Sequence, residues 1–300
     1  NPKAKCPALE NLIKRVFVND EDVILLFEEM LGYCLIKTCR YRKGFMLYGS
    51  GNNGKSTVLN IIKHFLGSKN FVSIELDKLT DKFKLPELEN KLANIGDDIN
   101  DKPIKDSGTI KKLLTGNSIL VERKGTRPFE MVSTAKHIFS CNSIPKSRDT
   151  SAGWYSRMVY IPLNAVFSPK DSDFDPNIED KVLTDEAMSY LLNRALKGVQ
   201  RLLKNGAFTE PEVVERALKL VKQANSTVLT WIDDEDITSE KLLEQPTTEI
   251  YTDFIKWCNE SNYDKFDIPK RNSFYKEIVK FFEFSNNRIQ KNDGYRYFTK

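Results

Sequence analysis

Residues 49–56 read Gly-Ser-Gly-Asn-Asn-Gly-Lys-Ser and constrain this chain more than any other segment. They match the pattern G-x-x-x-x-G-K-[ST], whose glycines let the backbone curl so that successive N–H groups face one centre at the start of a helix. An apolar run at 45–48 precedes the segment, and a helical pattern at 57–65 follows it. A strand, a phosphate-binding loop and a helix are therefore predicted here.

The residue types of this loop suit ATP and Mg²⁺. Lys55 can reach the β- and γ-phosphates, and the hydroxyl of Ser56 is a Mg²⁺ ligand. The residues that we expect to contact ATP are Gly49, Ser50, Gly51, Asn52, Asn53, Gly54, Lys55, Ser56 and Thr57.

A loop of this kind needs an acid on a neighbouring strand. Asp97 and Asp98 follow the run 92–96, so Asp97 is expected to hold Mg²⁺ through water and Asp98 to polarise the attacking water. Asp101 is a poorer candidate because it lies beyond the end of that strand. Asn142 ends the apolar run 138–141 and is expected to orient the water or touch the γ-phosphate.

Short apolar runs alternate with helical patterns through the middle of the chain. Strands interleaved with helices predict an α/β fold with a largely parallel sheet. The strand-like runs lie at 45–48, 71–74, 92–95, 119–121, 137–140 and 158–162. Helices are expected at 8–18, from the cap at 19–20 onward, and at 184–204, 210–232, 248–261 and 272–282, with a hairpin around 292–294. We divide the chain into an N-terminal helical region (1–39), a core (40–166), a helical extension (167–240) and a C-terminal domain (241–300).

Composition excludes several classes of protein. No stretch of about 18 apolar residues is present, so we expect no membrane span. Five scattered cysteines without a C-x-x-C pair, and two histidines, predict free thiols rather than a zinc or disulfide framework, in a reducing cytoplasm. The net charge of +4 equals the surplus of cations over anions in 262–300, a hint of nucleic-acid binding. The chain lacks a starting Met and is interpreted as an internal piece of a longer polypeptide.

The loop, the acidic pair and the strand-end asparagine together resemble the superfamily 3 helicases, above all the helicase part of phage and plasmid primase–helicases and of the poxvirus helicase-primase. The segments 113–118, 122–125, 127–129 and 142–145 carry this resemblance, which covers roughly residues 8–165. It implies an AAA+ P-loop core, a homo-hexameric ring and 3′-to-5′ translocation on single-stranded DNA. Many relatives have Glu in the acidic motif, so which Asp of the pair does which job stays open.

Further roles follow from the resemblance. Lys124, with Arg123 and Arg127, matches a hairpin whose basic tip grips the DNA backbone inside the ring. Arg157 matches the finger that reaches the neighbouring subunit's ATP, with Arg148 as the alternative. Arg42 or Lys43 matches another cation that crosses to a neighbouring subunit in some relatives.

The C-terminal piece resembles a winged helix. Its recognition helix would lie at 272–282, with Arg271, Lys276 and Lys280 toward DNA phosphates. Around the wing hairpin lie Arg288, Lys291 and Arg296, and the rings of Tyr295 and Tyr297 are available to stack or to pack.

These features favour an ATP-dependent DNA helicase that acts in replication of a phage or mobile element, in the cytoplasm of a bacterial host. Its expected partners are single-stranded DNA, forked or duplex DNA, further copies of itself, and a linked or associated primase or polymerase. The alternative is an AAA+ initiator or loader that remodels DNA without processive unwinding. A small-molecule kinase would not explain Asn142 and Arg157, and a non-catalytic DNA-binding module would not need Lys55 and Asp97.

Overall fold

The computed structural model describes residues 1–97, 99, 104, 106–265 and 267–300. Asp98, the expected water-polarising residue, and Asp101, the poorer candidate, lie outside the described residues. Contacts divide the chain into two compact units, residues 1–219 and residues 220–300.

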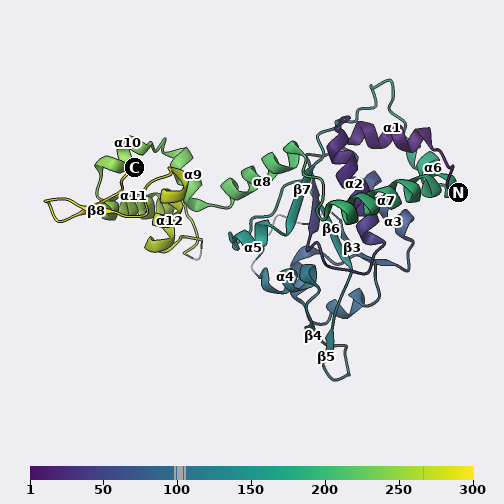
Figure 1. The fold of residues 1–300 in the computed structure, drawn as a ribbon, viewed down its shortest axis with the longest axis horizontal. Helices are drawn as coiled ribbons and strands as arrows, with labels where there is room; N and C mark the ends of the chain where they lie inside the picture. The colour runs from purple at the N-terminus through teal and green to yellow at the C-terminus, as the bar shows by residue number, and fades with distance from the viewer. Residues whose placement is uncertain (98, 100–103, 105, 266) are drawn as a thin grey trace. The chain divides into compact units, whose positions relative to one another are not determined.

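A five-stranded sheet lies at the centre of the first unit, and all of its strand pairs are parallel (Figure 1). The expectation of an α/β fold with a parallel sheet is confirmed. The strands occur in the order β2-β3-β6-β1-β7, so β6 lies between β3 and β1. Their bounds are β1 Gly44–Tyr48, β2 Phe71–Val72, β3 Ala93–Gly96, β6 Lys136–Cys141 and β7 Met158–Pro162.

The run at 119–121 does not join this sheet, although it was among the runs expected as its strands. It forms β4 (Ile119–Val121), which pairs antiparallel with β5 (Phe129–Met131) in a separate hairpin. Leu120 is exposed between two buried neighbours, so only one face of β4 is buried, unlike the central strands. The expected hairpin around the basic segment is therefore present.

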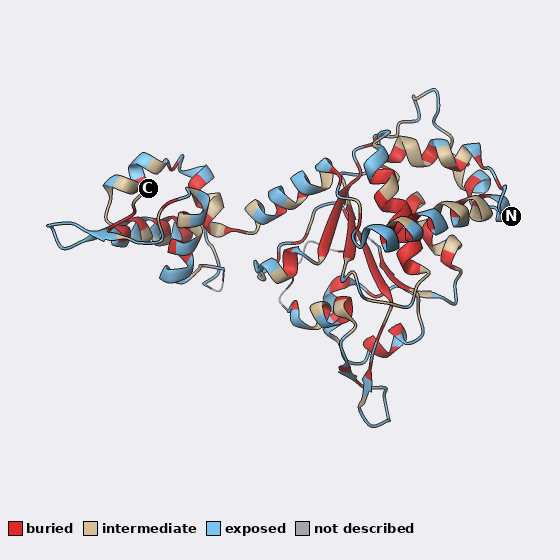
Figure 2. Ribbon diagram, viewed as in Figure 1, coloured by how far each residue is buried: buried red, intermediate tan, exposed pale blue. Residues whose placement is uncertain are grey.

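Helices cover the sheet of the first unit, and the apolar core lies between them and the strands (Figure 2). The side chain of Asp20 accepts a hydrogen bond from the Val23 amide and caps α2, as expected. Gly198 lets α2 and α7 approach closely, because a Cβ there would lie 2.3 Å from the carbonyl oxygen of Glu28. The helices that share this core are α1 Pro7–Val16, α2 Glu21–Cys34, α3 Lys55–Leu66, α6 Ile178–Val182 and α7 Asp185–Asn205.

One helix was expected at 210–232, but two are present. They are α8 (Glu212–Ala224) and α9 (Thr227–Asp234). Ser226 has extended backbone angles, and its hydroxyl accepts a hydrogen bond of 3.0 Å from the Leu229 amide. This side-chain cap starts a new helix and explains the break.

The second unit is a small helical domain with a hairpin. Its core contains Val228 and Trp231 of α9, and the stacked rings of Phe254 and Phe274, whose centroids lie 4.6 Å apart. Because α9 contributes to this core, the unit begins before residue 241, where the sequence had suggested a boundary. Its remaining elements are α10 Ser239–Glu244, α11 Thr247–Glu260, α12 Arg271–Phe281, β8 Ile289–Gln290 and β9 Arg296–Tyr297.

The five cysteines are free thiols. Across the described parts of both units, no helix combines the length and the apolar composition that crossing a bilayer requires.

Candidate active site

The glycine-rich loop, residues 49–54, joins β1 to α3. Gly54 has φ of 80° and Gly51 has φ of 27°, a region that other residues rarely adopt. Gly49 is needed for space, since a Cβ there would lie 2.6 Å from the Leu163 carbonyl oxygen. The loop conformation thus depends on glycine at all three positions.

Lys55 begins α3, and its side chain turns back into the loop. Its Nζ donates hydrogen bonds to the carbonyl oxygen of Gly49 and, at 3.0 Å, to Oδ1 of Asn53. The amide of Asn53 in turn donates to the Leu163 carbonyl at 3.2 Å. The lysine charge is therefore held inside the loop, whereas Ser50, Gly51, Asn52 and Ser56 are exposed and Thr57 is half-buried.

Three neighbouring strands end at one edge of the sheet, which we call the carboxyl edge. Because β1, β6 and β3 are parallel neighbours, the residues that follow them lie side by side at this edge. These residues are Gly49 of the loop, the exposed Asn142 and Asp97. The structure thus brings together three of the regions that the sequence selected.

Asp97 is half exposed and is oriented by its neighbours. Its Oδ1 accepts a hydrogen bond of 2.7 Å from the hydroxyl of Ser140 on β6, and its Oδ2 lies 3.8 Å from Nζ of Lys63 on α3. Ser140 had not been identified from the sequence, because a serine in a buried strand carries no local signal of this contact.

A cavity of about 620 Å³ borders the loop on the side of α1 and the 167–181 connector. Asn52, Gly54 and Thr57 contribute to one wall, and Phe167 and Phe174 contribute aromatic surface. No local sequence pattern indicates this cavity, because its lining comes from three distant segments, 8–15, 52–57 and 167–181.

Arg15 of α1 is anchored in the wall of the same cavity. Its guanidinium lies 4.5 Å from the centre of the Phe167 ring. It also forms ion pairs with Asp171, at 2.7 Å, and with Asp173. The Phe167 amide donates a hydrogen bond of 2.8 Å to the Asn52 carbonyl, so this wall and the loop are connected directly.

The three cations of the β4–β5 hairpin have different surroundings. Arg123 forms an ion pair with Glu89 and lies 4.8 Å from the centre of the Phe129 ring. Lys124 and Arg127 are exposed, and neither has an ion-pair or side-chain hydrogen-bond partner among the described residues. The charge of Arg123 is thus partly neutralised, whereas the other two remain available to a ligand.

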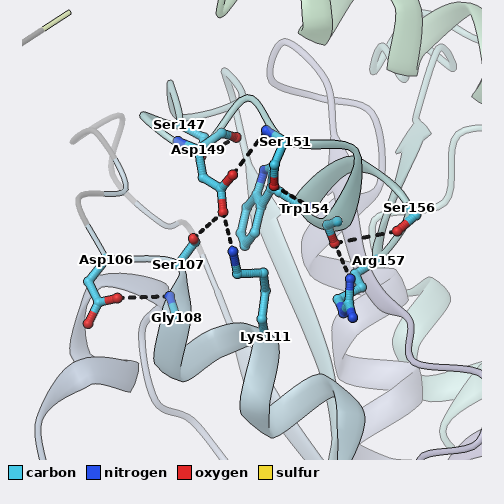
Figure 3. Close-up of polar contacts among 11 residues, drawn as sticks. Asp106, Ser107, Gly108, Lys111, Ser147, Asp149, Ser151, Trp154, Ser156 and Arg157 are labelled. Atoms are coloured by element: carbon cyan, nitrogen blue, oxygen red, sulfur yellow. Dashed lines mark hydrogen bonds and ion pairs between the residues drawn. The ribbon is translucent and has the colours of Figure 1, made fainter.

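Arg157 lies at the opposite edge of the sheet from the loop. It directly precedes β7, and its carbonyl oxygen accepts a hydrogen bond of 2.8 Å from the amide of Gly44, the first residue of β1. A five-residue strand spans roughly 16 Å at ~3.3 Å per residue, which separates Arg157 from the carboxyl edge of its own subunit. Its Nη1 donates to the carbonyl oxygen of Gly153 (Figure 3).

The other candidate subunit-crossing cations are Lys43, Arg42 and Arg148. Lys43 donates a hydrogen bond of 2.9 Å to the Ser156 carbonyl, and burial lowers its pKa below the ordinary value. Arg42 is exposed and has φ of 55°. Arg148 is exposed, and its amide donates to the Ile104 carbonyl at 3.3 Å.

In the second unit, several of the expected DNA-binding cations lie over aromatic rings. Lys276 and Lys280 are exposed on α12. The cation–ring pairs are Arg271 with Tyr251 at 5.2 Å, Arg288 with Tyr275 at 4.4 Å, and Lys291 with Tyr297 at 3.8 Å. Tyr295 is half exposed and Arg296 is exposed, whereas Tyr297 is buried and bonds Asp293.

Comparison with known proteins gives one family match. A family model described as a family of unknown function, DUF5906, matches residues 47–157. This range runs from β1 to Arg157 and includes the loop, Asp97, the β4–β5 hairpin and Asn142.

Two viral proteins with helicase names are distant relatives. "Putative helicase 184R" of Invertebrate iridescent virus 6 is 25% identical over 304 residues, which cover 85% of this chain and 30% of that protein. A "Putative helicase" of Acanthamoeba polyphaga mimivirus is 26% identical over 152 residues, which cover 46% of this chain and 15% of that protein. The chain therefore spans less than a third of the length of these relatives.

Solved structures of the C-terminal region of NrS-1 share the fold. One is similar with a TM-score of 0.61 and 14% identity, covering 100% of this chain and 76% of that chain. Another gives a TM-score of 0.56 with coverage of 99% and 76%. At this identity the likeness concerns the fold alone.

Proposed function

We propose that this chain is the ATP-driven motor of a DNA helicase. The observation that carries the proposal is the carboxyl edge of the sheet, where the glycine-rich loop with Lys55, the carboxylate of Asp97 and the amide of Asn142 end three adjacent parallel strands. The viral relatives with helicase names support it. The proposed motor is of the superfamily 3, AAA+ P-loop type and moves 3′-to-5′ on single-stranded DNA.

The proposed roles of these residues follow from the groups that are accessible at this edge. The loop amides and Lys55 bind the phosphates, because curled N–H groups at a helix start and a buried ammonium favour anions. Exposed Ser56 and half-exposed Asp97 offer the oxygen ligands that Mg²⁺ prefers, and the ion would neutralise phosphate charge. Asn142 orients the attacking water, and Asp98 is proposed to polarise it.

The cavity beside the loop is proposed to take the base and ribose of ATP. Its volume is in the range of small-molecule sites, and its wall combines aromatic surface with the polar side chain of Asn52. Since Arg15 is anchored by two aspartates, Phe167 keeps a defined position next to Gly54, where a Cβ would lie 3.2 Å from its ring.

Arg157 is proposed to act on the ATP of a neighbouring subunit in a homo-hexameric ring. Its location at the edge opposite its own loop supports action across a subunit boundary. A guanidinium there would spread positive charge over the transferring phosphoryl oxygens.

Lys124 and Arg127 are proposed to contact the backbone of single-stranded DNA. Replacing Lys124 with alanine is expected to weaken DNA binding and unwinding more than basal ATPase activity, because a phosphate contact is lost while the ATP site is intact. The slope of log affinity against log salt should fall by ~0.7 for each contact made. Titration of a labelled oligonucleotide at several salt concentrations measures this slope.

Lys69 supplies the control for that experiment, since it is an exposed lysine outside the hairpin. Lys69→Ala should leave both slope and unwinding at the wild-type level. A wild-type slope for Lys124→Ala would mean that the hairpin does not touch DNA.

The second unit is proposed to be a winged-helix-like domain that binds forked or duplex DNA through the cations around α12 and the β8–β9 hairpin. A chain that ends at Asn225 should fold and keep its ATPase activity, while duplex binding weakens by about tenfold or more. The reason is that α9, with Val228, Trp231 and Ile232, belongs to the core of the second unit. Circular dichroism, ATPase assays and duplex titration test this expectation.

A chain cut at residue 240 serves as its counterpart. It retains Val228, Trp231, Ile232 and Ile237 without the rest of that core, so four buried apolar side chains lose their cover, and it should aggregate more readily than the 1–225 chain. Equal loss of ATPase activity in both would mean that the second unit completes the motor.

The proposed function is tested by Mg²⁺-dependent ATP hydrolysis with and without single-stranded DNA, followed by strand displacement from a forked duplex with a 3′ tail. Stimulated hydrolysis with displacement supports the helicase. Stimulated hydrolysis without displacement would favour an AAA+ initiator or loader, and hydrolysis indifferent to DNA would overturn a DNA motor. Replication of a phage or mobile element, a primase or polymerase partner and a cytoplasmic location belong to the same proposal.

A further inference from the structure

A polar cluster around Asp149 connects two segments that the proposed mechanism uses separately. One is the segment 142–157, which runs from Asn142 at the carboxyl edge to Arg157 at the opposite edge. The other is α4 (Gly108–Thr115), which precedes the β4–β5 hairpin. The proposed ATP and DNA sites include neither Asp149 nor Lys111.

Asp149 is bonded by Ser107 and Lys111, at the start of α4, and by residues of its own segment (Figure 3). Its Oδ2 accepts a hydrogen bond of 2.6 Å from Nζ of Lys111 and another from the hydroxyl of Ser107, the residue before the helix. Its Oδ1 accepts a hydrogen bond of 3.0 Å from the amide of Ser151. Ser147 also bonds the backbone of Asp149, with its hydroxyl accepting from the Asp149 amide at 3.2 Å. The Asp149 carboxylate thus accepts hydrogen bonds from two different segments of the chain.

The cluster is shielded and charged. The side chain of Asp149 is 17% exposed, and Ser107 is buried. Although partial burial acts to raise the pKa of Asp149, hydrogen bonds from Lys111, Ser107 and Ser151 hold it well below the ordinary value. An ion pair shielded in this way is screened less by salt than an exposed one.

Each end of this connection is attached to buried residues. On one side, Ser151 caps α5 (Ala152–Tyr155) through the Trp154 amide, and Trp154 is fully buried just ahead of Arg157. On the other side, α4 buries Ile110, Leu113 and Leu114 and is capped by Gly116, three residues before β4 begins. A shift of segment 142–157 would therefore move α4, and with it the base of the hairpin.

We propose that Asp149 is a positioning residue that links segment 142–157 to α4, and through α4 to the β4–β5 hairpin. This link rests on the proposed function. It would couple Asn142 and Arg157, which are proposed to act on ATP, to the loop 122–128, which is proposed to contact DNA. The link is the ion pair between Asp149 and Lys111. Its loss should uncouple the ATP site from the DNA site without abolishing either activity.

The test uses Lys111→Met, which keeps the length of the side chain and removes its charge. Lys112→Met is the matched control, because Lys112 is the exposed neighbour on the same helix. The quantity measured is the ratio of ATPase rates with and without saturating single-stranded DNA. For Lys111→Met this ratio should fall by about fivefold or more, the lower range of typical coupling between sites, while the basal rate stays within about twofold.

A charge swap tests whether the ion pair couples the two sites or only stabilises the fold. The double variant Asp149→Lys with Lys111→Asp should recover part of the ratio lost in Lys111→Met. A wild-type ratio in Lys111→Met would overturn the coupling. So would a parallel fall of basal rate, stimulated rate and unfolding midpoint, which would mark the cluster as purely structural. If the wild-type chain hydrolyses ATP at the same rate with and without DNA, the proposed function is wrong. The coupling, which rests on it, is then wrong as well.

Discussion

Replacing Arg157 with alanine is expected to lower ATP hydrolysis by about 10³-fold or more while leaving ATP binding near the wild-type level. An arginine supplied across a subunit boundary contributes ~10³–10⁵ in rate, because it stabilises charge on the transferring phosphoryl group. Binding is spared because Arg157 lies at the sheet edge away from its own loop. Turnover assays and a fluorescent-nucleotide titration measure the two effects separately.

Mixed assemblies decide whether Arg157 acts on a neighbour. When Arg157→Ala is mixed with Lys55→Ala, an interface that joins the intact Lys55 of one subunit to the intact Arg157 of the next should recover hydrolysis. Arg40→Ala, at an exposed arginine without a proposed role, should behave as wild type. Normal turnover of Arg157→Ala alone, together with no recovery in mixed rings, would exclude this finger and favour Arg148.

Replacing Lys55 with alanine should reduce Mg²⁺-dependent ATP hydrolysis by about a hundredfold or more. Loss of a preorganised group that stabilises developing charge typically costs ~10²–10³ in rate. The ammonium is buried among loop atoms, at the Gly49 carbonyl and at 3.0 Å from Asn53, so its charge is held at the loop in a defined position. Steady-state hydrolysis and nucleotide binding are the measurements.

Lys197→Ala is the control, because it removes an exposed lysine of α7. Lys55→Arg adds a further comparison: it keeps the charge but brings a bulkier, planar group into a closed loop, and it should remain strongly impaired. Turnover by Lys55→Ala at the wild-type rate would rule out the glycine-rich loop as the catalytic phosphate site.

Local sequence patterns were sufficient to predict much of the first unit. The strands around Phe45 and Val159, the cap at Asp20 and the hairpin around Lys124 all occur where the sequence indicated them. Each depends on periodicity or on hydrogen bonds between residues close in the chain, and such signals are readable from a short window. The break at Ser226 was missed because apolar residues continue through it at nearly helical spacing, and the capping hydroxyl carries a weaker signal.

The glycine-rich loop, the acid that follows a strand and the strand-end Asn142 are all recognisable in the sequence. The fold was needed to learn that β6 lies between β1 and β3, that Arg157 lies at the far edge, and that Arg15 reaches Phe167. The ion pair of Asp149 with Lys111 belongs to the same group. The physical reason is that strand order and long-range ion pairs minimise the free energy of the whole packed unit, so no local pattern encodes them.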